Sequence, residues 1–236
     1  MKLSIIISDT NRSLYYLIYL LENKIFINNI YYFSKDKNVK LNPKVIKNKL
    51  LNESIKKLIS QGSTLKQVAR KHIKKGSKIH KFKNLSVNSE KFFRSIKKEI
   101  GTTIIFSGYP GEILSKKFFT LKIRFLHVHA GYLPKYKGST ANYYSILNNE
   151  PIGFSAILMN DQIDGGHIII RKKYDLPIVP ELYDLHYDNL FRSMMLIKAI
   201  KFLSKSKKLI LNKKSFHYYI IHPVLKMLAY RKMISK

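Results

Sequence analysis

The sequence contains no cysteine, few acidic residues and no long apolar run. The lack of cysteine excludes disulfides, a thiolate nucleophile and Cys-ligated zinc, and it fits a reducing compartment. A membrane-spanning helix needs about 20 apolar residues. Neither residues 14–21 nor the N-terminal residues 1–7 offer such a run, and the latter are also too short for a signal-peptide core. We therefore expect a cytoplasmic protein.

The shortage of acidic residues gives the chain a large positive charge: 44 lysines and arginines against 14 acidic residues, or +30 over 236 residues. Such an excess favours anionic partners, namely nucleic acid, phosphate-bearing substrates or acidic membranes. Compositional bias is the other explanation, because lysine greatly outnumbers arginine and the basic residues are spread along the chain. We favour bias and expect no stable nucleic-acid partner, whereas weak association with anionic surfaces stays open.

The apolar residues suffice for a buried core, since 45% of the chain is hydrophobic and 12% aromatic. In the first half, short apolar runs typical of buried strands alternate with helical patterns, which predicts a parallel sheet. Strands are expected at residues 2–8, 30–34, 78–82, 102–107 and 122–128. Helices are expected from residue 13 after a Ser or Asn cap, at 42–74 with a break at Gly62, and at 89–100 with Ser89 as cap.

The second half predicts a different arrangement. A helix at residues 140–148 precedes two strands, at 152–159 and 166–174, whose short connection suits an antiparallel hairpin. A long amphipathic helix is expected at 182–204. Residues 216–226 are predicted to be a helix packed on the domain, with a membrane-surface segment as the alternative. The fold class is α/β: a Rossmann-like, doubly wound, mostly parallel sheet with an antiparallel hairpin near the C-terminal side.

Two histidines and an aspartate stand where a ligand site is expected. His127 and His129 are two residues apart at the end of the fifth strand, so both side chains point to one face at the carboxyl edge of the sheet. Asp164 lies in the hairpin loop, and a carboxylate beside a histidine fixes its tautomer and favours its charged form. The spacing alone leaves three explanations open: unrelated strand histidines, a metal site, and a catalytic pair that handles protons.

Three stretches of the sequence resemble the folate-dependent formyltransferase family. LHVHAGYLPKYKG (residues 126–138) and IDGG (163–166) are similar to the family's Asn-x-His-Pro-Ser-Leu-Leu-Pro-x-Tyr-Arg-Gly and Asp-x-Gly motifs. IIFSGYPGEIL (104–114) is similar to the strand and loop that hold the pterin there. The resemblance covers residues 1–204, which we expect to form a catalytic domain with a fold like that of glycinamide ribonucleotide transformylase. A short basic extension, 205–236, follows.

The resemblance implies direct transfer of a formyl group from 10-formyltetrahydrofolate to an amine, with no metal and no covalent intermediate. It assigns the catalytic histidine to His129 and the aspartate to Asp164, and it puts His127 where the family has asparagine. This is a departure, because asparagine donates to the formyl oxygen. A neutral His127 has one N–H that can do likewise, whereas a protonated one raises the cost of a cationic His129. Both histidines are expected to stabilise the oxyanion, and Asp164 to orient His129 and help remove the amine proton.

The resemblance also implies where the two substrates bind. The folate is expected against residues 108–114 and 160–164, with contacts from Gly108, Tyr109, Ile113, Leu114 and Asp161. Packing under a loop is the alternative for Tyr109 and Ile113. Contacts with the acceptor are expected from Lys137, Tyr143 and Arg12. The alternative for Tyr143 is that it packs in the core as an aromatic residue in the first turn of a helix. The alternative for Arg12 is that it is an exposed residue at the start of a helix.

Three acceptor amines fit the family. The purine enzyme binds a ribose phosphate with a Gly-rich turn after its first strand, but the turn at residues 9–13 here has no glycine and contains Asp9. The tRNA enzyme carries an additional C-terminal domain, for which the residues after Ile170 leave little room. We therefore expect an amino-sugar nucleotide, of the kind destined for surface polysaccharides. A homodimer stays open.

Two other classes of function stay open beside the transferase. A basic nucleic-acid-binding or membrane-binding protein on a degenerate formyltransferase scaffold would account for the net charge of +30 and for His127. It predicts no loss of function from His129→Ala. A metal-dependent hydrolase would use both histidines and Asp164 as ligands and would lose activity to chelators.

Overall fold

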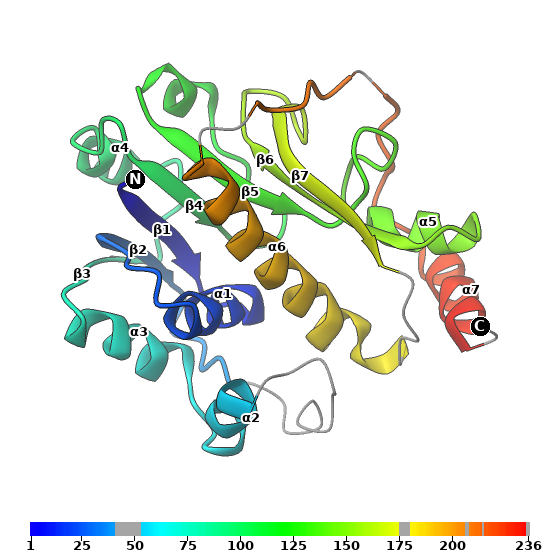
Figure 1. Cartoon of the computed structure of the whole chain (residues 1–236), viewed down its shortest axis with the longest axis horizontal. Helices are drawn as coiled ribbons and strands as arrows, with labels where there is room; N and C mark the ends of the chain where they lie inside the picture. Colours follow the sequence, from blue (N-terminus) through cyan, green and yellow to red (C-terminus); the bar gives the residue numbers. More distant parts are fainter. Residues whose placement is uncertain (41–52, 175–179, 206–207, 214, 235–236) are drawn as a thin grey trace. The chain divides into compact units, whose positions relative to one another are not determined.

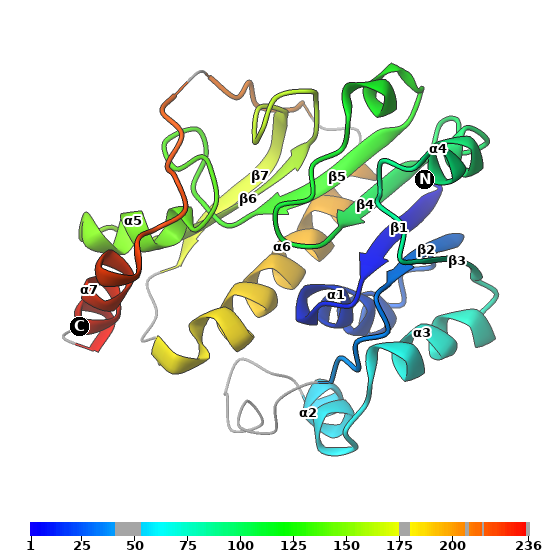
Figure 2. The same cartoon turned by 180° about the vertical axis from the view of Figure 1, so that it is seen from behind.

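The computed structural model describes residues 1–40, 53–174, 180–205, 208–213 and 215–234. The chain divides into two compact units, an N-terminal unit (Met1–Leu126) and a C-terminal unit (His127–Lys236). The strands follow the order β3-β2-β1-β4-β5-β6-β7 in a seven-stranded sheet (Figures 1 and 2). Every described helix is too short or too polar to cross a membrane.

The strands of the N-terminal unit are parallel. β1 (Leu3–Ser8) pairs with β2 (Asn29–Ser34) and with β4 (Thr103–Ser107), β2 pairs with β3 (Lys78–Lys83), and β4 pairs with the start of β5 (Arg124–His129). All six residues of β1 are buried, as expected for a central parallel strand covered on both faces. The predicted parallel α/β sheet is confirmed.

Helices connect these strands. They are α1 (Asn11–Glu22), α2 (Glu53–Ser60), α3 (Leu65–Lys74), α4 (Glu90–Ile96) and a 3₁₀ turn, η2 (Lys116–Thr120). The predicted cap of α1 is wrong: Thr10 caps it by accepting from the Ser13 N–H, because a β-branched hydroxyl serves at this position as well. The Ser89 side chain makes no capping bond, and α4 ends at Ile96 instead of residue 100. Residues 41–52 of the predicted 42–74 region lie outside the described residues, whereas the break near Gly62 is confirmed by its position between α2 and α3.

The C-terminal unit contains the predicted hairpin. β6 (Ile152–Leu158) and β7 (His167–Tyr174) are antiparallel, with a register shift after Ala156. α6 (Asp188–Leu203) contacts both strands, and Phe191 lies against Phe154 and Tyr174. α5 (Ala141–Leu147) lies beside α7 (Pro223–Ile234) (Figure 2).

Two predicted helices of this unit need correction. The 182–204 helix is three segments, a 3₁₀ turn η3 (Pro180–Leu182), a π-helical turn η4 (Tyr183–Tyr187) and α6, and most positions of α6 are buried, so it is not simply amphipathic. Residues 216–222 are not helical, and α7 begins only at Pro223. Proline suits a first helical position because its fixed φ is already helical and it needs no partner for an N–H. The predicted boundary at 204/205 between catalytic domain and extension stays a prediction.

Candidate active site

The two histidines lie at the carboxyl end of β5, in the C-terminal unit. His129 is only 5% exposed, whereas His127, two residues earlier on the same face of the strand, is half-buried. β5 leads directly into the loop at residues 130–138. The two histidines therefore differ in burial, since His129 is enclosed by protein groups and His127 is partly exposed.

His129 is held through both ring nitrogens. Its Nδ1 lies 3.2 Å from Oδ1 of Asp164, and its Nε2 lies 2.7 Å from the backbone oxygen of Tyr136. Because a carboxylate and a carbonyl are both acceptors, the ring donates to both at once only as imidazolium, and as a neutral ring it donates to one of them. The predicted partnership of His129 and Asp164 is thus present in the geometry of the described residues, and we call it the His129–Asp164 pair.

Asp164 is placed by its own backbone and by a second donor. Its φ of 50° is a left-handed conformation that aspartate tolerates better than most residues, and the Gly138 N–H donates to Oδ2 at 2.9 Å. Burial alone would raise the pKa of this carboxyl group. The nearby His129, the Gly138 N–H and His127 together outweigh burial and hold the pKa of Asp164 below its ordinary value. The carboxylate therefore stays charged throughout the neutral range.

The loop at residues 130–138 is shaped by β6 and β7. Ser155 Oγ accepts from the Leu133 N–H at 3.0 Å and donates to the Gly131 oxygen at 2.8 Å, while the Arg171 guanidinium donates to the Leu133 oxygen. A Cβ at Gly131 would lie 2.4 Å from Nε2 of His129. Glycine is required there because the backbone passes directly against the imidazole.

Residues of the C-terminal extension also contact this loop, which the sequence did not predict. The Asn212 side chain donates to the Asp164 backbone oxygen at 2.6 Å, and the Tyr218 N–H donates to the Lys137 oxygen at 2.9 Å. Gly138 has a φ of +97°, and a Cβ there would lie 2.1 Å from the Tyr218 oxygen. The extension therefore supports the backbone on both sides of the Gly138–Asp164 contact.

Most of the residues predicted to bind the donor lie in the N-terminal unit, on the loop after β4. The Gly108 oxygen accepts from Arg12 at 2.5 Å, Tyr109 is half-buried with Lys35 Nζ 4.6 Å from its ring centre, and Ile113 is 53% exposed. Leu114 is 3% exposed and belongs to the core. Asp161 is exposed in the β6–β7 loop of the C-terminal unit. Their contact with a folate stays a prediction.

The residues predicted to bind the acceptor are largely engaged with protein groups. Lys137 is 5% exposed and its ammonium donates to the Lys213 oxygen at 3.0 Å. The Tyr143 hydroxyl donates to Asp184 at 2.7 Å, and its ring is 2% exposed. Arg12, at the start of α1, also lies 3.4 Å from the Ser107 hydroxyl. Their contact with an acceptor also stays a prediction, but the geometry of Lys137 and Tyr143 favours a packing role.

Asp9 forms a second organised carboxylate, at the turn after β1. The Tyr32 hydroxyl donates to Oδ1, while Ser34 Oγ at 3.1 Å and the backbone N–H groups of Lys35 at 2.8 Å and Lys37 at 3.1 Å donate to Oδ2. The Tyr109 hydroxyl lies 3.4 Å from Oδ2. From the sequence we noted only that this turn lacks a glycine. The hydrogen-bond donors to Asp9 could not be predicted, because they come from residues far along the chain.

The described residues contain no group of three or more His, Cys, Asp or Glu that could hold a metal ion. What the His129–Asp164 pair can do is bind and move protons, stabilise negative charge that develops on an oxygen, and orient the imidazole.

Comparison with known proteins relates this chain to formyl transferases. A family model described as formyl transferase matches residues 1–186. Methionyl-tRNA formyltransferase of Caldanaerobacter subterraneus subsp. tengcongensis is 28% identical over 126 residues, which are 52% of this chain and 39% of that protein. The enzyme of the same name from Finegoldia magna is 31% identical over 103 residues, 43% of this chain and 33% of the relative. The match thus spans well under two thirds of these relatives.

Solved structures resemble the chain over most of its length. A sugar N-formyltransferase from a Shewanella species has a TM-score of 0.57 at 18% identity, and the match covers 99% of this chain and 88% of that protein. The Helicobacter canadensis N-formyltransferase, solved with folinic acid and dTDP-3-aminofucose, has a TM-score of 0.56 at 17% identity. The match covers 93% of this chain and 71% of that protein. Glycinamide ribonucleotide transformylase 1 of Symbiobacterium toebii has a TM-score of 0.57 at 11% identity, and the match covers 90% of this chain and 94% of that protein. At these identities the likeness shows the fold alone.

Proposed function

Since the chain belongs to the formyl transferase family, we propose that it transfers a formyl group from 10-formyltetrahydrofolate to the amine of an amino-sugar nucleotide. The observation that carries this proposal is the His129–Asp164 pair, in which Nδ1 lies 3.2 Å from a carboxylate whose pKa is held below its ordinary value. Such a pair supplies a charged acceptor for a proton and an oriented imidazole beside it.

In the proposed reaction the acceptor nitrogen attacks the formyl carbon and a C–N bond forms. The carbonyl oxygen becomes negative in the tetrahedral intermediate, and an N–H of His127 stabilises it. The bond between the formyl carbon and N10 of the folate then breaks, and one proton passes from the acceptor nitrogen to N10 by way of Asp164. A carboxylate has about four acceptor positions, so Asp164 can take this proton's hydrogen bond beside those from His129 and Gly138.

His127 is the histidine that the reaction can reach directly. It is half-buried, whereas His129 is 5% exposed and its Nε2 is occupied by the Tyr136 oxygen. We assign to His127 the hydrogen bond that the family's asparagine gives to the formyl oxygen. His129 then acts mainly by setting the charge and position of Asp164.

The donor is proposed to contact exposed apolar side chains on two loops. Ile113 on the loop after β4 is 53% exposed and Ile163 beside Asp164 is 51% exposed, so each can pack against a flat ring without rearrangement of the core. Leu114, at 3% exposure, would contribute only by supporting the loop. Tyr109, Gly108 and Asp161 keep their proposed contacts.

Asp9 supports a sugar nucleotide over glycinamide ribonucleotide as acceptor. A phosphate bound at the turn after β1 would lie beside the Asp9 carboxylate, which already accepts the N–H groups of Lys35 and Lys37. A second anion there would also be repelled by that carboxylate. We therefore propose that the phosphates of the acceptor do not bind at this turn. In a sugar nucleotide the phosphates are attached to the sugar and can lie away from it.

The test is an acceptor panel. The protein is incubated with 10-formyltetrahydrofolate and, separately, with dTDP- and UDP-linked amino sugars, glycinamide ribonucleotide and methionyl-tRNA, and both tetrahydrofolate release and the formylated product are measured. We expect acceptor-dependent release with an amino-sugar nucleotide. Turnover only with methionyl-tRNA or glycinamide ribonucleotide would keep the chemistry but overturn the acceptor. No turnover with any amine would overturn the function.

A binding protein on a degenerate scaffold is the second candidate, and His127 in place of asparagine favours it. The two candidates differ in one variant. His129→Ala abolishes formyl transfer if the chain is the proposed enzyme, and it leaves polyanion binding unchanged if the chain is a binding protein.

A further inference from the structure

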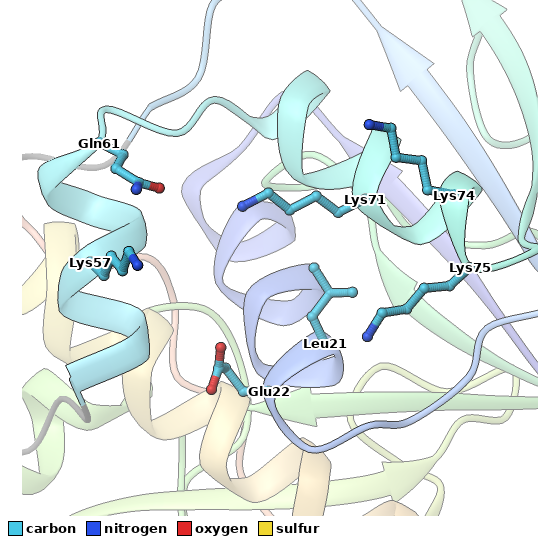
Figure 3. A pocket seen from close by; sticks show the side chains of 7 residues that line it. All are labelled: Leu21, Glu22, Lys57, Gln61, Lys71, Lys74 and Lys75. Carbon is cyan, nitrogen blue, oxygen red and sulfur yellow. The ribbon is translucent and has the colours of Figure 1, made fainter.

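A lysine-rich cleft of about 620 Å³ lies on the helices of the N-terminal unit (Figure 3). The ends of α1, α2 and α3 form it. Its seven lining residues are Leu21, Glu22, Lys57, Gln61, Lys71, Lys74 and Lys75. Four of the seven are lysines, whereas lysine and arginine together make up 44 of the 236 residues of the chain. Lysines are therefore concentrated here well beyond the general basic composition.

The described residues do not balance the positive charge in the cleft. Among the described lining residues only Glu22 is acidic, and none of the four lysine ammonium groups forms an ion pair with another described residue. In Figure 3 the side chains of Lys57 and Lys71 extend from α2 and α3 into the space between these helices. Like charges that line one cleft repel one another, and a bound anion would relieve that repulsion.

The two helices that supply most of the lining are held firmly together. His72 is 2% exposed, and its Nε2 lies 2.9 Å from the Leu17 oxygen, which joins α3 to α1 between Lys71 and Lys74. A capping box fixes the start of α3: the Thr64 hydroxyl accepts from the Gln67 N–H, and the Gln67 side chain accepts from the Thr64 N–H. The backbone positions of Lys71, Lys74 and Lys75 relative to the end of α1 are thus set before a ligand arrives.

Within the N-terminal unit, this cleft is separate from Arg12 and Asp9. Arg12 and Glu22 lie ten residues apart on α1, a rise of about 15 Å along the helix. The turn with Asp9 is at the start of α1, whereas the cleft is at its end. A ligand in the cleft would therefore not compete directly with a group bound at that turn.

We propose that the cleft binds a chain of linked phosphates, as in inorganic polyphosphate or the triphosphate of a nucleotide. Its volume suits a small ligand, since such sites are typically about 300–1,000 Å³. Lysine ammonium groups bind phosphate as point charges, and each terminal phosphate carries about −1.5 to −2 at pH 7. Sites for single-stranded nucleic acid add aromatic side chains for base stacking, and the described residues that line this cleft include none. The chemistry therefore favours phosphates over bases.

The experiment is a calorimetric titration of the full chain with inorganic tripolyphosphate, repeated with ATP, AMP and a short single-stranded DNA. We expect tripolyphosphate to bind more tightly than AMP, and the affinity to fall as salt is raised. If ATP binds as tightly as tripolyphosphate, the cleft recognises the phosphate chain of a nucleotide as well. If ATP binds more weakly than tripolyphosphate, the ligand is free polyphosphate. Binding of the DNA more tightly than tripolyphosphate at the same salt would overturn the proposal in favour of nucleic acid.

A matched pair of triple variants locates the site. In the first, Lys71, Lys74 and Lys75 are changed to Gln, and we expect the affinity for tripolyphosphate to fall about tenfold or more, because charge-assisted contacts are lost. The second removes the same charge from exposed lysines of this unit that do not line the cleft, by Lys81→Gln, Lys91→Gln and Lys98→Gln. An equal fall in both would show attraction to net charge alone and would refute the site. Circular dichroism and thermal unfolding confirm that both variants are folded.

Discussion

Asp164→Asn gives the sharpest test of the active-site geometry. The change keeps the shape of the side chain but removes the charge that faces Nδ1 of His129 at 3.2 Å and accepts from the Gly138 N–H at 2.9 Å. A hydrogen bond to a charged group contributes about 1.5–3 kcal/mol, and 1.36 kcal/mol is a factor of ten, so loss of the pair alone slows the reaction about 10- to 150-fold. A group that also moves a proton contributes about 10²–10⁴-fold. We therefore expect kcat to fall by about 10²–10⁴-fold, with KM for the folate little changed.

The assay is steady-state release of tetrahydrofolate with the best acceptor of the panel. Glu90→Gln serves as the control, because Glu90 is an exposed acidic residue at the start of α4 whose contacts are with Arg94 and Lys117. It removes one charge at the surface and should leave kcat within a factor of about two. A folded Asp164→Asn protein with kcat within tenfold of the parent would refute a catalytic role for this carboxylate.

Three further changes test its surroundings. His127→Asn restores the family's residue and should keep kcat within about tenfold of the parent. His127→Ala should lower kcat about 10²–10³-fold, because a hydrogen-bond donor to the oxyanion is lost. Equal rates in both variants would contradict the hydrogen bond assigned to His127. Asn212→Ala removes the 2.6 Å bond to the Asp164 backbone oxygen and should lower kcat about tenfold with KM unchanged, while an effect on thermal unfolding alone would make Asn212 merely structural. Because the pKa of folded Asp164 is below its ordinary value, its contribution to stability is complete above the unfolded value of about 3.9 and is lost as pH falls below it. Urea unfolding at pH 5.5 and 3.5 should therefore show a smaller loss of stability in Asp164→Asn than in the parent, and parallel losses would contradict the shift.

The sheet and the contact between His129 and Asp164 were predictable from the sequence for distinct physical reasons. Central parallel strands such as Leu3–Ser8 are apolar on both faces, so they stand out as short continuous runs. The pair was predictable because the strand ending at His129 and the hairpin loop holding Asp164 both carry short motifs, and the i, i+2 spacing of the histidines fixes which face they share.

Helix ends were harder to predict, because several residue types serve equally as caps and because burial on several sides hides periodicity. α6 is buried at most of its positions, so the amphipathic pattern did not separate it from the preceding turns at Pro180–Leu182 and Tyr183–Tyr187. The apolar residues before α7 suggested a helix starting at residue 216. Pro223 was the better signal, since proline favours the first helical position.

Long-range contacts of the site were outside the reach of local patterns. Asn212 is 48 residues from Asp164 in sequence, and nothing near it signals a bond to that residue. The donors that converge on Asp9 come from the end of β2 and from Tyr109, 100 residues away. Only the folded sheet brings such groups to one carboxylate.

The central claim is that the chain moves a formyl group to an amine by means of the His129–Asp164 pair. The most direct measurement is the stoichiometry of the reaction: tetrahydrofolate released and formylated amino-sugar nucleotide formed, each by mass spectrometry, with and without acceptor. Our account predicts one formylated product per tetrahydrofolate and no release without acceptor. Release that needs no acceptor, with free formate as the product, would show hydrolysis and contradict it.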